Sequence, residues 1–346
     1  MTIADESIRW GIVATGGIAR TMAADLRLLD DARLVAVSSR SAQRARAFAD
    51  EFGVERAYGS IEELLADDDV DVVYVATPHP QHAPVVGAAL DAGRAVLCEK
   101  SFTGSLGDTE ELVQRARDRR IFCMEAMWTR FTPLVARARS IIADGGIGDV
   151  RTVIADLGFV APRDPLHRLW NPVLGGGAIL DLGVYTVALA QMVLGEPVTV
   201  EAHGSLSAEG VDAEAGLLLG WDGGARALLD MSLVAHSPGA ATIIGTAGRL
   251  DLPPRFHHPT RLVHTGVDGT EQVYEHEHEG RGYVPMLREV QQCLREGRTE
   301  SAVMPLDDTV AIMRVLDRGL RLLGVRYPPP APVPAVAPGW PIGPTA

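Results

Sequence analysis

The sequence predicts an α/β domain with a doubly wound parallel sheet, followed by a C-terminal α+β domain with a large, mainly antiparallel, open sheet. Up to residue 126, short apolar runs alternate with amphipathic helical stretches. From residue 127 onward, strand candidates follow one another with short turns between them. A chain of 346 residues is long enough for two domain cores. We therefore expect domains at 1–126 and 127–327, with a Pro-rich, irregular tail at 328–346.

The first domain contains five compact apolar runs. They are Ile8–Val13, Leu34–Ser38, Val70–Ala76, Ala95–Cys98 and Ile121–Met124. None shows the polar alternation of a half-exposed strand, and a parallel sheet covered on both faces requires this near-continuous pattern. Helix starts lie between the runs: Ser60 with Glu63 forms a capping box, and Ser41 can cap a helix that extends towards Phe52.

The second domain begins with a helix and then becomes rich in strands. The expected elements are a helix from near Pro133 to about Gly145, a strand at Val150–Leu157, a helix from near Gly177, strands between Val198 and Tyr274, and helices at Val284–Glu296 and Leu306–Leu323. Turn residues such as Asp222-Gly223-Gly224 separate the strands and favour antiparallel pairing.

Composition excludes several classes of function. The net charge is −13 and no basic stripe occurs, so we expect no nucleic-acid partner. No apolar run approaches the roughly 20 residues that span a bilayer, and the first ten residues lack the pattern of a secretory signal. The three cysteines, Cys98, Cys123 and Cys293, cannot all pair within one chain. A reducing cytoplasm is the simplest compartment.

A nucleotide-binding turn follows the first strand. The segment from Ala14 to Ala19 has the spacing G-x-G-x-x-G/A, with Ala14 at the first glycine position, and it opens a helix. In this Rossmann-type context a pyrophosphate would lie on the helix N-terminus, where free amides favour negative charge. The alternative is a turn of small residues without a ligand. The cofactor residues predicted here are Ala14, Thr15, Gly16, Gly17 and Ile18.

The end of the second strand favours NADP over NAD. Ser39 and Arg40 stand where an NAD-specific site commonly has a carboxylate for the ribose hydroxyls. A guanidinium can pair with a 2′-phosphate, which a carboxylate would repel. The alternatives are that Arg40 is a solvated loop residue and that NAD is the cofactor.

From these residues onward the chain resembles the Gfo/Idh/MocA oxidoreductases, the superfamily of glucose–fructose oxidoreductase and inositol dehydrogenase. Four segments carry the resemblance in order: Trp10–Ala19, Ala76-Thr77-Pro78, Cys98-Glu99-Lys100, and Gly175-Gly176-Gly177 through Asp181 to Tyr185. Two further segments, 125–131 and 168–172, look most like the branch of dimeric dihydrodiol dehydrogenases and xylose-type sugar dehydrogenases.

The resemblance implies that Lys100, Tyr185 and Asp181 are catalytic. The family has Glu-Lys-Pro where this chain has Glu99-Lys100-Ser101, so the lysine is kept and the proline is lost. An ammonium beside a nicotinamide can polarise a substrate oxygen, and we expect it to lower the phenol pKa of Tyr185 towards the working range. Asp181 and Tyr185 are four residues apart and share a helical face. The alternatives are that Lys100 is merely solvated, that Asp181 lies near the helix start because of the helix dipole, and that Tyr185 only packs in the core.

The resemblance assigns further contacts to the cofactor and the substrate. Those assigned to the cofactor are Thr77, Pro78, His79, His82, Glu99, Lys100, Trp128 and Arg130, and Arg168 is assigned to the substrate with Asp181 and Tyr185. Three alternatives stay open. The first is that His79 is an exposed loop residue. The second is that Trp128 and Arg130 lock the two domains together, and the third is that Arg168 binds a cofactor phosphate.

We expect no metal. The tract Glu275-His276-Glu277-His278-Glu279 alternates, so a strand would place both histidines on one face and the acids on the other. His257-His258 is a distant further pair. Without complementary Cys or Asp ligands nearby, a solvated strand or loop explains the tract.

These residues together predict an NADP-dependent oxidoreductase. It would transfer hydride between the nicotinamide and a hydroxyl-bearing carbon of a sugar, a polyol or a cyclic trans-diol, or act on the CH–CH bond of a trans-dihydrodiol. The alternatives are a non-catalytic, NADP-sensing regulator of the same fold and a reductase of a non-sugar substrate. The resemblance also implies a homodimer.

Overall fold

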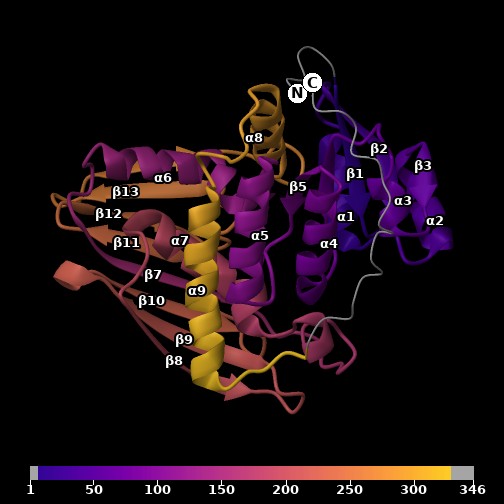
Figure 1. Cartoon of the computed structure of the whole chain (residues 1–346). Coiled ribbons are helices and arrows are strands. Elements are labelled where there is room, and N and C mark those ends of the chain that lie inside the picture. Colours follow the sequence, from indigo (N-terminus) through magenta and orange to yellow (C-terminus); the bar gives the residue numbers. More distant parts are fainter. Residues whose placement is uncertain (1–6, 329–346) are drawn as a thin grey trace.

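The computed structural model describes residues 7–328 of the chain. The predicted Pro-rich tail therefore lies, apart from Pro328, outside the described residues. The strands form two sheets, of six and eight strands, one from each half of the chain (Figure 1). The predicted fold class, a parallel sheet followed by a mainly antiparallel one, is confirmed.

The first sheet is parallel and has the order β3-β2-β1-β4-β5-β6. Its strands are β1 (Ile8–Val13), β2 (Ala32–Ser38), β3 (Arg56–Tyr58), β4 (Val72–Val75), β5 (Ala95–Cys98) and β6 (Cys123–Glu125). Every residue of β4 and β5 is buried, as expected for a sheet covered on both faces. The order reverses between β1 and β4, and ligands of such sheets bind at the carboxyl ends of the strands at this point.

Helices flank this sheet, and α1, α2 and α3 start where the sequence predicts. They are α1 (Gly17–Leu26), α2 (Ala42–Phe52), α3 (Ile61–Leu65), α4 (His79–Asp91) and α5 (Leu106–Arg119). The hydroxyl of Ser41 caps α2, and that of Ser60 accepts from the N–H of Glu63 at 3.2 Å. The Glu63 carboxylate accepts from the N–H of Gly59, so the capping box closes one residue earlier than the usual pattern.

The second sheet has the order β14-β13-β12-β11-β7-β10-β9-β8. Its strands are β7 (Val150–Gly158), β8 (Thr199–Leu206), β9 (Asp212–Gly220), β10 (Arg226–Ser232), β11 (Ala241–Gly245), β12 (Gly248–Leu252), β13 (Arg261–Gly266) and β14 (Glu271–Glu275). All neighbours pair antiparallel except β7 and β10, which are parallel because the chain leaves β7 and returns through α7 before it forms β8 to β10.

Helices cover one face of the second sheet (Figure 1). The helices of this half are α6 (Pro133–Ala143), α7 (Val184–Leu194), α8 (Val284–Arg295) and α9 (Leu306–Leu323), with short helical turns at Trp128–Phe131, Pro172–Leu174 and Asp222–Gly224. α9 packs on β8 and β9, and it also packs on α5, so it joins the two halves. Large apolar side chains stay exposed on the strands, among them Ile154, Leu218 and Leu228.

A π-helical turn, Ile179–Gly183, precedes α7 and continues into it. The segment Pro172–Leu194 that contains both is long and apolar enough to cross a membrane, with a mean hydropathy of 1.7. The expectation that no apolar run approaches the length that spans a bilayer was therefore wrong for this segment. Since 89% of its apolar window is buried inside the fold, it has the surroundings of a core helix.

Candidate active site

The turn between β1 and α1 is shaped to receive a phosphate. Ala14 has φ +89°, a conformation that glycine adopts with less strain, and its N–H donates to the carbonyl of Ser38 at the end of β2. Gly16 and Gly17 are exposed, and a Cβ added to either would meet no atom within 4 Å. The first turn of α1 carries no acidic side chain. Open space before free helix amides fits the pyrophosphate of a dinucleotide.

The predicted NADP determinants lie at the same edge of the sheet. Ser39 follows β2 and is half-buried, whereas Arg40 is exposed. Within residues 7–328, Arg40 makes no ion pair with a carboxylate, so its guanidinium is available to an anion.

Lys100 follows β5 and points at the start of α7. Its side chain is 13% exposed, and its Nζ donates to the backbone carbonyl of Asp181 at 2.8 Å. The same nitrogen lies 3.6 Å from Asp181 Oδ1 and 4.6 Å from the centroid of the Tyr185 ring. Burial lowers the pKa of Lys100, but the neighbouring Tyr185, Asp181 and Glu99 raise it more, so the net shift is upward and the side chain is an ammonium. The alternative of a solvated lysine does not fit this environment.

Asp181 is held ionised by two cations. Arg168 donates to its carboxylate at 2.7 Å, and Lys100 approaches it from the other half of the chain. Burial alone would raise the pKa of Asp181, but Lys100 and Arg168 hold it well below its usual range. The π-helical turn thus presents a fixed negative charge between the two cations. The predicted grouping of Lys100, Asp181 and Arg168 is present in the structure.

The phenol of Tyr185 completes the cluster, but one electrostatic prediction was wrong. Its oxygen accepts a hydrogen bond from Trp128 Nε1 at 3.0 Å. Burial raises the pKa of Tyr185, and although Lys100 and the Trp128 N–H lower it, the net shift is upward from the ordinary value. The side chain is 8% exposed, so the cost of burying a phenolate outweighs the nearby ammonium. Tyr185 is therefore a neutral phenol at neutral pH.

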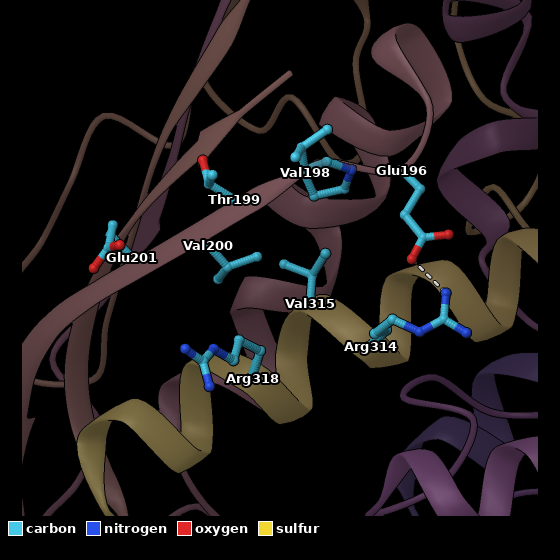
Figure 2. A pocket seen from close by; sticks show the side chains of 9 residues that line it. Glu196, Val198, Thr199, Val200, Glu201, Arg314, Val315 and Arg318 are labelled. Carbon is cyan, nitrogen blue, oxygen red and sulfur yellow. Dashed lines mark hydrogen bonds and ion pairs between the residues drawn. The ribbon is translucent and has the colours of Figure 1, made fainter. Parts of the chain in front are cut away.

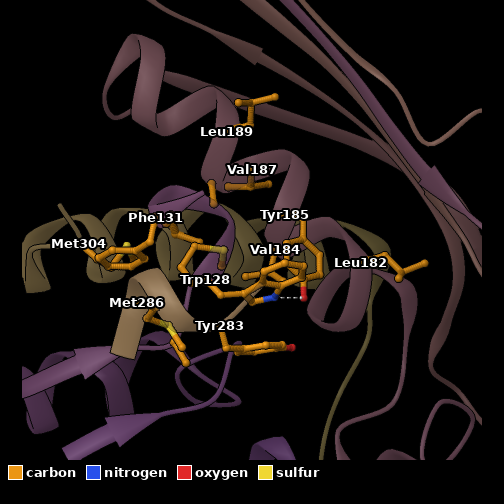
Figure 3. Close-up of a cluster of buried hydrophobic side chains, with 14 of the residues drawn as sticks. Trp128, Phe131, Leu182, Val184, Tyr185, Val187, Leu189, Tyr283, Met286 and Met304 are labelled. Carbon is orange, nitrogen blue, oxygen red and sulfur yellow. Dashed lines mark hydrogen bonds between the residues drawn. The ribbon is translucent and has the colours of Figure 1, made fainter. Parts of the chain in front are cut away.

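Two aromatic side chains that were not predicted to belong to the site, Tyr283 and His257, pack beside Tyr185 and Trp128. Tyr283 stacks on Trp128 with ring centroids 4.9 Å apart (Figure 3). The backbone N–H of Tyr283 donates to the buried carboxylate of Asp25, on α1, at 2.9 Å. His257 lies against the Tyr185 ring, 5.2 Å between centroids. Sequence spacing could not identify these residues because they come from loops far along the chain from Trp128.

His79 and His82 support the backbone around Lys100. His79 is 7% exposed, so the alternative of an exposed loop residue is wrong. Its ring nitrogens lie 3.1 and 3.2 Å from the carbonyls of Gly175 and Lys100. Those of His82 lie near the carbonyls of Ser101 and Thr77. Burial lowers the pKa of His79 to about 3, so the ring is neutral. Both rings serve here to hold loops together.

Thr77, Pro78 and Glu99 also lie around this loop. Thr77 follows β4, and its buried hydroxyl has no hydrogen-bond partner within the described residues. Pro78 is the N-cap residue of α4. Glu99 is buried, accepts from the hydroxyl of Tyr74 at 2.5 Å and accepts from the N–H of Lys100. Glu99 thus orients Lys100, and the unpartnered Thr77 hydroxyl is free for a ligand.

Arg130 lies inside the protein, away from the nucleotide-binding turn. Its guanidinium donates to Asp308 at 2.5 Å, and to Gln191 and the carbonyl of Ala188. With 3% exposure it ties α7 to α9. This burial does not fit the assignment of Arg130 to the cofactor. Arg130 does not lock the two domains together either, because Asp308, Gln191 and Ala188 all belong to the second half of the chain. Trp128, in contrast, reaches the Tyr185 phenol.

The histidine-rich tract follows β14 and is mostly exposed. His278 stacks on His258 with centroids 3.6 Å apart. Within residues 7–328 no group of three or more His, Cys, Asp or Glu side chains is placed to hold a metal ion. The absence of a metal stays a prediction.

A hollow of about 370 Å³ lies between β8 and α9, outside the cluster around Lys100 (Figure 2). Its charged side chains include Arg314, which pairs with Glu196 and Glu110. Because none of the residues described above lines it, we assign the chemistry to the Lys100 cluster.

The comparisons with known proteins agree with this geometry. Residues 8–126 match the oxidoreductase family with an NAD-binding Rossmann fold, and residues 135–251 match the Gfo/Idh/MocA C-terminal domain. The trans-1,2-dihydrobenzene-1,2-diol dehydrogenase of Mus musculus is 35% identical over 342 residues, covering 93% of this chain and 98% of the relative. That of Xenopus tropicalis is 36% identical over 332 residues, covering 92% and 99%.

Solved structures share the whole fold. KijD10, a 3-ketoreductase from Actinomadura kijaniata in complex with NADP and TDP-benzene, has a TM-score of 0.78 at 26% identity, covering 90% of this chain and 96% of that one. A levoglucosan dehydrogenase with NADH and levoglucosan has a TM-score of 0.84 at 20% identity, covering 92% and 97%. The second likeness shows the fold alone.

Proposed function

Because this chain belongs to the Gfo/Idh/MocA family of oxidoreductases, we propose that it is an NADP-dependent dehydrogenase of a sugar, a polyol or a cyclic trans-diol. One observation carries the proposal. The Lys100 ammonium, from the first half of the chain, lies 4.6 Å from the Tyr185 ring centroid, from the second half. Such a pair can hold one substrate oxygen between an ammonium and a phenol.

The first sheet would hold the cofactor. The β1–α1 turn would bind the pyrophosphate and Arg40 the 2′-phosphate. The nicotinamide would lie towards Thr77 and Lys100, at the carboxyl ends of β4 and β5. A bound nicotinamide supplies the acceptor or donor of the hydride. The cofactors named for the solved relatives include both NADP and NADH, so the preference for NADP rests on Arg40.

Tyr185 moves the proton, and Lys100 stabilises charge. The phenol oxygen already accepts from Trp128, and no described residue accepts its O–H proton, which leaves that proton for a substrate oxygen. During reduction of a carbonyl the neutral phenol gives this proton to the oxygen as the C–O double bond becomes single. During oxidation the same oxygen returns its proton to a phenolate, while Lys100 stabilises the developing alkoxide. Asp181 keeps Lys100 in place and ionised.

The test is to measure turnover of a panel of sugars, polyols and trans-diols, with the formation of NADPH monitored by its absorbance. We expect turnover of at least one member with NADP. Binding of NADP without turnover of any member would favour a sensor of the same fold. Reduction of imines or other non-sugars alone would favour a different reductase.

We propose that the protein is a homodimer that pairs through the exposed face of its second sheet. Ile154 on β7 stands opposite Leu228 on β10, and Leu228 stands opposite Leu218 on β9. The three side chains are 44%, 44% and 49% exposed, and a continuous apolar row of this kind favours association. Light scattering of the wild type and of the Leu228→Asp variant tests this proposal. We expect the wild type to be a dimer and the variant to be a monomer, and a monomeric wild type would contradict the proposal.

A cytoplasmic location, without a nucleic-acid or membrane partner, belongs to the same proposal. The three cysteines are buried and unpaired, which supports a reducing compartment. Fractionation of the native cells tests it.

A further inference from the structure

One half-buried imidazole beside the catalytic pair has no role so far. His257 lies in the loop 253–260, between β12 and β13. Its carbonyl accepts from the hydroxyl of Thr129 at 2.7 Å, so the loop is fastened to the turn that carries Trp128. The ring of His257 lies 5.2 Å from that of Tyr185 and 6.1 Å from that of Trp128, measured between centroids. Packing thus fixes the imidazole next to the phenol.

The ring of His257 differs from those of the buried His79 and His82 in its hydrogen bonds. Each nitrogen of His79 and His82 lies within hydrogen-bond distance of a backbone carbonyl. Nδ1 of His257 is buried and has no hydrogen-bond partner within the described residues. Since burying an unpaired polar atom is costly, such an atom at an active site indicates a ligand group that satisfies it.

The charge state of His257 indicates which kind of ligand group can pair with it. Burial, with the charge of Lys100 and the neighbouring His258, lowers the pKa of His257 to about 4. The imidazole is therefore neutral at physiological pH, with one N–H donor and one lone pair. A hydroxyl group, which both donates and accepts, complements a neutral imidazole. A carboxylate or phosphate would gain no ion pair from it.

We propose that His257 binds a second hydroxyl of the substrate, adjacent to the one that Tyr185 and Lys100 hold. This inference rests on the proposed function and deepens it: the substrate carries at least a vicinal diol, and a simple alcohol is a poor substrate. The phenol and the ammonium would hold the reacting oxygen, and the imidazole would hold the neighbouring one.

The test compares a diol with a mono-alcohol of the same ring. The substrates are trans-cyclohexane-1,2-diol and cyclohexanol, with NADP as oxidant, and the variants are His257→Phe and His257→Asn. His276→Phe, in an exposed part of the neighbouring histidine-rich tract, is the matched control. For His257→Phe we expect kcat/KM for the diol to fall about tenfold or more, as loss of one hydrogen bond predicts, and that for cyclohexanol to change less than about threefold. His257→Asn, which keeps a donor and an acceptor, recovers part of the loss.

The outcomes separate the two proposals. An equal change for diol and mono-alcohol in His257→Phe overturns the role of His257 and leaves the proposed function intact. A wild type that turns over neither these substrates nor any member of the sugar panel refutes the proposed function, and the role of His257 with it. If cyclohexanol reacts too slowly, its inhibition constant against the diol replaces kcat/KM. Circular dichroism and the Kd for NADP show whether each variant is folded. If His257→Phe is not folded, the ratio of kcat/KM for the diol to kcat/KM for cyclohexanol in His257→Asn decides the question.

Discussion

Replacing Arg130 by methionine separates a packing role from a cofactor role. The guanidinium is 3% exposed and is bonded to Asp308, to Gln191 and to a backbone carbonyl. Breaking a buried pair from one side costs about 3 to 5 kcal/mol, because it leaves an unpaired charge. Asp308 is 29% exposed and can regain some water, which favours the lower end, about 3 kcal/mol.

The assay is unfolding by urea together with NADP binding followed by fluorescence. We expect Arg130→Met to lower the free energy of unfolding by about 3 kcal/mol and to leave the Kd for NADP unchanged. The double variant Arg130→Met with Asp308→Leu should recover part of this loss, because replacing both partners removes the unpaired carboxylate. Weaker NADP binding with unchanged stability would refute the packing role.

Three further predictions follow from charges. Arg40→Asp should raise the Kd for NADP about tenfold or more while leaving that for NAD nearly unchanged, as read by fluorescence titration. Burial raises the pKa of Asp212, whose carboxylate accepts from the N–H of Ile179 at 2.6 Å, from 3.8 to about 7. Asp212 should therefore contribute stability that is lost as pH rises from about 4 towards 7, and urea unfolding of Asp212→Asn should show a smaller loss over this range than the wild type. Because the pKa of Tyr185 is raised, kcat/KM for oxidation should rise about tenfold per pH unit through neutrality.

Each of these has a contrary outcome. Equal losses for NADP and NAD would show that Arg40 does not contact the 2′-phosphate. An unchanged pH slope in Asp212→Asn would assign that slope to another group. A pH-independent oxidation rate around neutrality would mean that Tyr185 is not the group that accepts the proton.

Local patterns predicted most of the fold. Ser41 and Ser60 mark helix starts because a hydroxyl beside a free amide is a local interaction. β3 was missed, because a strand of three half-buried residues at a sheet edge has no apolar run to reveal it. The helix expected from near Gly177 begins instead as a π-helical turn, which Asp212 caps from the neighbouring sheet. A contact so distant in sequence is invisible to spacing.

The candidate site was predictable only where motifs carry it. Lys100, Asp181 and Tyr185 come together as expected, since each follows a recognisable strand or glycine run. Tyr283 and His257 were not predicted, because long loops bring them to the site. The phenol pKa of Tyr185 was predicted in the wrong direction, because burial, which a sequence does not reveal, outweighs the neighbouring charge. Arg130 was misassigned for the same reason.

The most direct test of the account is the rate of hydride transfer in a single turnover, measured for Lys100→Met, Tyr185→Phe and the double variant. If the ammonium and the phenol act on one oxygen as a unit, each single change should slow the step about 100-fold or more, and the double variant should be little slower than the slower single variant. Near-normal rates in either single variant, with NADP still bound, would contradict the account.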